Sequence, residues 1–76
     1  MPRLPRVSGR QAVQALERAG WEVARQRGSH VVLTWPGSIY TLSVPLHREL
    51  GPGLLRSLLR KAELSVEEFQ DLLEAR

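Results

Sequence analysis

Residues 21–44, WEVARQRGSHVVLTWPGSIYTLSV, decide the fold, because they hold three stretches in which apolar and polar side chains alternate. The apolar positions are Trp21 and Val23, then Val31, Leu33 and Trp35, then Tyr40, Leu42 and Val44. Gly28-Ser29 separates the first two stretches, and Pro36–Ser38 separates the last two. A period of two, interrupted by short turns, predicts an antiparallel meander of three strands, the first of which ends near Arg27.

The alternation also divides the side chains between the two faces of the predicted sheet. His30 is out of phase with Val31 and Leu33. If the apolar positions pack against helices, His30 therefore faces solvent. We also expect Val32 and Ile39 on the uncovered face, where an exposed apolar patch would suit a protein partner.

A helix is predicted before the meander. Met1–Val7 contains two prolines and no apolar pattern, which indicates an extended lead-in. Ser8 and Gln11 have the spacing of a capping box, and Gly20 has the position of a C-terminal stop. The apolar face of this helix holds Ala12, Val13, Leu16 and Ala19.

Two further helices are predicted after the meander. Pro45–Pro52 is expected to be a loop, because proline cannot continue a strand ladder. Gly53 opens the second helix, and Ser65 begins the third through a capping box with Glu68. The apolar stripes are Leu54, Leu55, Leu58, Leu59 and Ala62 in the second helix, and Val66, Phe69, Leu72 and Leu73 in the third.

The predicted fold is therefore α+β. Its order is α-β-β-β-α-α, with a three-stranded antiparallel sheet covered on one face by helices. This is the topology of double-stranded-RNA-binding domains, which recognise RNA by its shape and its phosphates.

The composition narrows the class of protein. At 76 residues we expect a single domain over residues 1–76. The chain has no cysteine and two histidines, which excludes disulfides and thiolate metal sites and argues against a zinc cluster, so we expect no metal or cofactor. No apolar run approaches the ~18 residues that would span a bilayer, and we expect a soluble cytoplasmic protein without membrane association.

The charge is unevenly distributed. Lys and Arg total 11 against 8 Asp and Glu, a net charge of +3. Residues 1–60 contain nine arginines and three glutamates, whereas residues 61–76 contain two basic and five acidic residues. A basic body favours polyanions, which bind through their phosphates. A net charge of +3 alone is more typical of an ordinary soluble surface.

The sequence Gly28-Ser29-His30 is the first candidate for chemistry, because Arg25 and Arg27 directly precede it. A histidine side chain, with an unperturbed pKa near ~6.5, can accept and donate protons around neutrality. Neighbouring guanidinium groups would stabilise charge that builds on a phosphate. The alternative is an ordinary exposed histidine at a strand end.

Two further groups of residues are candidates for RNA contacts. His47 lies in the loop before the second helix, where free backbone N–H groups and the helix dipole attract phosphate, although it is also typical of a solvated loop. Arg56 and Arg60, with Lys61, form a basic ridge that would follow an RNA backbone or simply face solvent. Trp21 and Trp35 are expected in the core rather than in base stacking.

Three motifs together are similar to one family. They are RQRGSHVVL at residues 25–33, VPLH at residues 44–47 and LGPGLLRSLLRKAELS at residues 50–65. They resemble the HicA (YcfA-like) mRNA interferases of bacterial toxin-antitoxin pairs, and the resemblance extends from Ser8 to about Leu73. Glu63 occupies a position where such proteins often carry glycine, and Pro52 lies between the two glycines of the loop.

The resemblance implies a double-stranded-RNA-binding-domain-like fold and metal-independent cleavage of messenger RNA, with His30 as the catalytic residue. It also implies a HicB-type antitoxin that binds the toxin and covers its active site. The leading hypothesis is thus an endoribonuclease centred on His30. The candidate RNA-binding residues are Arg25, Arg27, Ser29, His47, Arg48, Arg56 and Arg60. The alternatives are a non-catalytic RNA-binding module of the same fold and a subunit that only docks on a partner.

Overall fold

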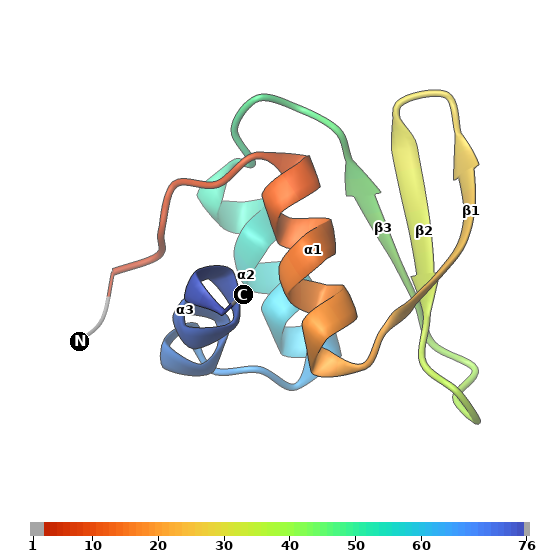
Figure 1. The fold of residues 1–76 in the computed structure, drawn as a ribbon. Helices are drawn as coiled ribbons and strands as arrows, with labels where there is room; N and C mark the ends of the chain where they lie inside the picture. The colour runs from red at the N-terminus through yellow and green to blue at the C-terminus, as the bar shows by residue number, and fades with distance from the viewer. Residues whose placement is uncertain (1–2, 76) are drawn as a thin grey trace.

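The structure is a computed structural model that describes residues 3–75. Within this range the chain forms three helices and three strands in the predicted α-β-β-β-α-α order (Figure 1). The elements are α1 (Gly9–Ala19), β1 (Glu22–Arg27), β2 (His30–Thr34), β3 (Thr41–Pro45), α2 (Pro52–Ala62) and α3 (Val66–Glu74). Of the expected lead-in, Met1 and Pro2 lie outside the described residues, and residues 3–8 have no regular secondary structure.

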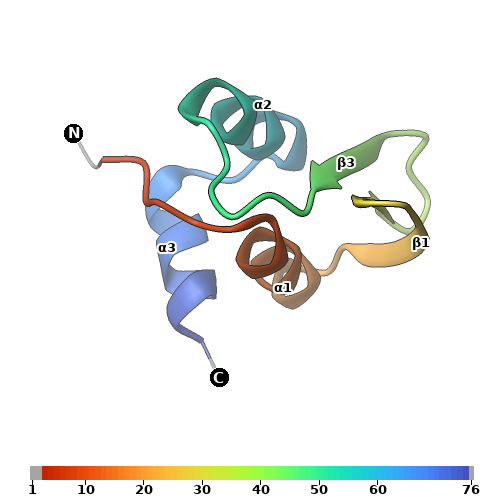
Figure 2. The same cartoon turned by 90° about the horizontal axis from the view of Figure 1, so that it is seen from above.

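The three strands form one antiparallel sheet in the order β1-β2-β3. Val31 pairs with Val44, and Leu33 pairs with Leu42. All four of these side chains are buried against the helices, which lie together on one side of the sheet (Figures 1 and 2). The α+β fold, with one face of the sheet covered and the other open, is the one that the sequence predicts, and it is consistent with the double-stranded-RNA-binding-domain topology.

Local sequence determines both ends of α1. The side chain of Ser8 accepts a hydrogen bond from the N–H of Gln11 at 3.1 Å, and the Gln11 side chain accepts one from the N–H of Ser8 at 2.9 Å. This confirms the predicted capping box, which satisfies two N–H groups that the helix itself leaves unpaired. Gly20 ends the helix with φ 115°, a conformation that favours glycine.

Helix α2 begins at Pro52, one residue before the predicted start at Gly53. Proline suits this first position, because the N–H that it lacks would have no partner within the helix. The helix ends at Glu63, whose backbone is left-handed with φ 57° and ψ 40°. This is the position at which glycine is common in the family that the sequence resembles.

Helix α3 begins with the predicted capping box of Ser65 and Glu68. The backbone N–H and, secondly, the side chain of Ser65 donate hydrogen bonds that lower the pKa of the Glu68 carboxyl group. The helix packs on α1, on the side away from the sheet (Figures 1 and 2). An Arg18 guanidinium N–H of α1 donates a 2.7 Å hydrogen bond to the carbonyl of Leu72, and Phe69 is fully buried.

The core lies between the sheet and the helices. Its fully buried large side chains are Leu16, Leu33, Leu42, Val44, Leu55 and Phe69. Leu54, which was predicted to belong to the apolar stripe of α2, is instead 37% exposed because it lies on the flank of the helix. Among the described residues no helix is long and apolar enough to cross a membrane.

The edges of the sheet differ from the predicted alternation. Val23 is 45% exposed although it pairs with the buried Leu33, and every residue of the edge strand β1 is exposed in the same way. Trp35 and Tyr40 lie just outside β2 and β3 and are partly exposed, so the expectation that Trp35 belongs to the core is wrong. Ile39 lies in the connection between β2 and β3 rather than on the open face.

Pro45 was expected in the loop, but it is the last residue of β3 and pairs with His30. A proline is tolerated there because β3 is an edge strand and needs no further N–H at its end.

Candidate functional site

His30 is the first residue of β2, and its side chain is exposed. In the register of the sheet it lies opposite Arg27 of β1 and Pro45 of β3. Directly opposed residues project from the same face with Cβ atoms about 4.5–5.5 Å apart. Arg27 is therefore the cross-strand neighbour of His30 on the face that no helix covers.

The bulge in β1 places Arg25 on this open face as well. Val23 pairs with Leu33, which points to the helices, whereas Arg25 pairs with Val32, which does not. Ala24 is the extra residue between them. If Ala24 were paired with Val32 instead of bulged, the alternation would turn both arginines toward the helices. Bulges commonly redirect side chains near functional sites in this way.

The loop after β3 is fastened to the same end of the sheet. The N–H of Leu46 donates a hydrogen bond to the carbonyl of Ser29 at 2.6 Å, which joins the loop to the β1–β2 turn. The N–H of Gly9 donates to the carbonyl of His47 at 2.9 Å, which joins the loop to the start of α1. The turn, the loop and the first helix thus meet beside His30.

Gly9 makes this junction possible. A Cβ atom added at Gly9 would lie 1.9 Å from the carbonyl oxygen of Pro45, far inside van der Waals contact. The close approach of α1 to the loop therefore requires a glycine. The sequence analysis did not predict this role. The signal that could have indicated it is a glycine in the first turn of a helix, where it has no capping function.

His47 and Arg48 lie in this loop with exposed side chains. The loop leads into α2. The N-cap residue of this helix is Gly51, which has no side chain that could form a capping hydrogen bond. We name six residues at this end of the molecule the His30 cluster: Arg25, Arg27, Ser29, His30, His47 and Arg48. The register places Arg25, Arg27 and His30 on one face, and the hydrogen bond from Leu46 to Ser29 holds the loop with His47 and Arg48 at the same end of the sheet.

The other two predicted RNA-binding residues follow α2 away from the His30 cluster. Arg56 and Arg60 are exposed and lie one helical turn apart. Arg60 lines a hollow that it shares with Trp35, beyond the far end of β2. The structure therefore does not place Arg60 beside His30.

The His30 cluster is cationic. It contains three arginines and two histidines and no carboxylate, and such a surface attracts phosphate groups. Within residues 3–75 there is no group of three or more His, Cys, Asp or Glu side chains that could hold a metal ion. An exposed imidazole beside guanidinium groups can transfer a proton and stabilise negative charge on a phosphate.

The fold and the site together define a small α+β domain with a double-stranded-RNA-binding-domain-like topology and with His30, Arg25 and Arg27 on its open sheet face. The family described as HicA toxin of bacterial toxin-antitoxin matches residues 9–64, which is well over half of the chain. The chain therefore belongs to the HicA toxin family, as the sequence motifs suggest. The match begins at the first residue of α1 and includes the whole His30 cluster. No curated protein matches the chain.

Proposed function

We propose that this chain is an endoribonuclease that cleaves messenger RNA, with His30 as the proton-transfer residue. The observation that carries the proposal is the register that aligns Arg25, Arg27 and His30 on the open face of the sheet. Membership of a toxin family supports it, because such a toxin needs a target in the cell that produces it.

The proposed reaction uses the substrate's own 2′-hydroxyl group as the nucleophile. His30 accepts the proton of this hydroxyl while its oxygen bonds to the adjacent phosphorus atom. The bond from phosphorus to the 5′-oxygen then breaks, and this oxygen takes a proton, for which His47 is the candidate donor. Arg25 and Arg27 stabilise the negative charge on the phosphate during the exchange. The nucleophile is part of the RNA, so no metal-bound water is required.

A HicB-type antitoxin is the proposed partner of this site. The face that carries His30 is free of helices, and Val32 contributes a partly buried apolar side chain between the paired Arg25 and Ser43. An antitoxin with acidic groups around an apolar centre would match this surface and exclude RNA from it.

The test is cleavage of single-stranded RNA by the purified protein in the presence of a chelator. We expect His30→Ala to lower the cleavage rate by about 10²- to 10⁴-fold, the usual contribution of a positioned acid or base. Thr41→Ala is the matched control, because Thr41 is exposed on the same face of the sheet and has no proposed role. Equal cleavage by the His30→Ala variant would remove the proposal.

Binding of RNA without cleavage by the unmodified protein would favour the non-catalytic RNA-binding module. Expression in a bacterium gives an independent result, since a toxin should arrest growth and His30→Ala should relieve the arrest. Harmless expression of the unmodified chain would contradict the proposal.

A further inference from the structure

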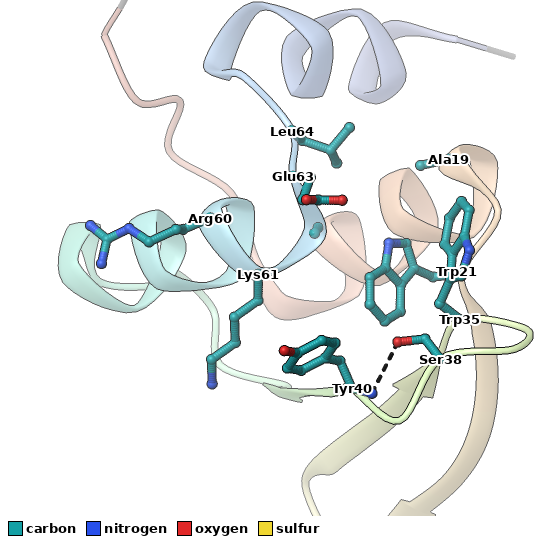
Figure 3. A pocket seen from close by; sticks show the side chains of 10 residues that line it. Ala19, Trp21, Trp35, Ser38, Tyr40, Arg60, Lys61, Glu63 and Leu64 are labelled. Carbon is teal, nitrogen blue, oxygen red and sulfur yellow. Dashed lines mark hydrogen bonds between the residues drawn. The ribbon is translucent and has the colours of Figure 1, made fainter.

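A hollow of about 690 Å³ lies at the end of the molecule opposite the His30 cluster. Three aromatic side chains, Trp21, Trp35 and Tyr40, form one part of its wall (Figure 3). The end of α1 and the last turn of α2 with the residues that follow it complete the wall. Its size is within the range of small-molecule binding sites, which is about 300–1,000 Å³.

The aromatic wall is buried at its base and accessible at its rim. Trp21 is 5% exposed and contacts Trp35 edge to face, with ring centroids 5.5 Å apart. Trp35 also lies against Gly20, where an added Cβ atom would come within 3.0 Å of the indole. Tyr40 is 67% exposed and Trp35 is 41% exposed, so both rings offer free surface to a ligand.

The charges at the rim are of both signs, because Glu63 lines the hollow together with Arg60 and Lys61. Lys61 extends from α2 on the side of Tyr40, and Arg60 points away from the aromatic wall (Figure 3). Helices α1 and α2 both end at the hollow, and the negative end of a helix dipole disfavours phosphate. A base therefore suits the hollow itself, with its phosphate outside near Lys61.

Strand β2 connects the hollow to the His30 cluster. His30 begins this strand, and Trp35 directly follows its last residue. Five residues of extended chain cover about 17 Å, which equals about five stacked nucleotides at 3.4 Å each. One single-stranded RNA could thus reach both places.

We propose that the hollow binds a base of single-stranded RNA by stacking on Tyr40 and Trp35, a few nucleotides from the scissile phosphate. The proposal rests on the proposed function, because it assigns a second contact to the same substrate. A protein segment would be expected to use Ile39, which is 92% exposed beside Tyr40, but Ile39 does not line the hollow.

Tryptophan fluorescence reports directly on this site, because the chain has two tryptophans and both line the hollow. The probe is a 12-nucleotide oligouridylate added to the His30→Ala variant, which should not cleave it. We expect saturable quenching of the tryptophan emission. An abasic oligomer of the same length retains the phosphates and should give no quenching. Quenching of equal size by the abasic oligomer, or none by oligouridylate, would overturn the proposal.

Affinity measurements on Tyr40 variants provide the second test. Tyr40→Ala in the His30→Ala background should weaken oligouridylate binding by about 5- to 150-fold, the usual effect of losing one stacked base. Tyr40→Phe keeps the ring and should bind like the parent. Ile39→Ala is the matched control and should change the affinity less than twofold. If Tyr40→Ala binds RNA normally but no longer binds a HicB-type antitoxin, the hollow is a protein site and the proposal is wrong.

The two proposals fail in different ways. If the unmodified chain cleaves RNA but Tyr40→Ala does not weaken binding, the base site is wrong and the endoribonuclease stands. If the unmodified chain never cleaves RNA but oligouridylate quenches the tryptophans and the abasic oligomer does not, the base site stands and the endoribonuclease is wrong.

Discussion

Gly9 shows how a single residue positions the His30 end of the molecule. It is the first residue of α1, and its N–H binds the carbonyl of His47. Because it has no side chain, the helix can approach the carbonyl of Pro45 closely. Because Gly9 has no side chain, Pro45 can pair with His30 and the loop can take its place beside α1.

Gly9→Ala should destabilise the protein by about 1–3 kcal/mol, the usual effect of forcing extra atoms into a tightly packed place. Thermal or urea unfolding measures this loss. Gly53→Ala is the matched control, because nothing lies within 4 Å of a Cβ at Gly53 in α2. It should stabilise the protein by about 0.5–1 kcal/mol through the better helix propensity of alanine. Equal effects of the two substitutions would contradict the role assigned to Gly9.

At the scale of single residues, the candidate site was only partly predictable from the sequence. The exposure of His30 follows from alternation with Val31 and Leu33, which is a local pattern. The orientation of Arg25 and Arg27 does not, since an unbroken alternation would place them on the face of Val23. Their true orientation depends on pairing between two strands, which a linear pattern does not contain.

The helices show how far local sequence determines an element. The capping boxes of α1 and α3 were predicted correctly, because their residues are three positions apart and contact only one another. The end of α2 is different. Glu63 occupies a left-handed conformation in which a side chain is strained, and it does so without the glycine that usually stops a helix.

Glu63→Gly should therefore stabilise the protein by about 1 kcal/mol, which raises the melting temperature of a domain of this size by roughly 4–8 °C. Thermal unfolding followed by circular dichroism provides the measurement. Glu63→Ala removes the same carboxylate but keeps the side-chain strain, so it should give no such gain. A melting temperature that rises equally in both variants would show that charge, and not backbone conformation, limits this helix end.

The ends of the strands were less predictable than the helices. Trp35 and Tyr40 follow the strand alternation in the sequence, but both lie where the chain has left the sheet for the turn. The alternation shows the type of element, whereas the last paired residue depends on hydrogen bonding across the sheet. The hollow beyond β2 could not be predicted for the same reason.

At the scale of the whole molecule, charge is separated between opposite sides. The open sheet face carries Arg25 and Arg27, while α3 carries Glu67, Asp71 and Glu74 on the other side of α1 (Figure 2). The sequence predicted this division into a basic body and an acidic end. Such a separation orients a polyanion toward the basic face before contact.

Binding of single-stranded RNA to the His30→Ala variant should weaken as salt increases. Each phosphate contact contributes about −0.7 to the slope of log affinity against log salt concentration. Replacing both Arg25 and Arg27 with alanine should make the slope shallower by about 1.4. Arg3→Ala is the control. Arg3 also carries one positive charge but lies near α3, so its replacement should leave the slope unchanged. An unchanged slope in the double variant would show that these arginines do not contact phosphate.

The extra residue in β1 has a genetic consequence. An in-frame loss of codon 24 would remove a small, chemically inert side chain and leave every ionisable group of the chain in place. The turn between β1 and β2 would keep Arg27 opposite His30 and Arg25 opposite Val32, so both guanidinium groups would stay on the open face. A gene that lost this codon would therefore encode a strand with regular alternation and an unchanged arrangement of the proposed site residues.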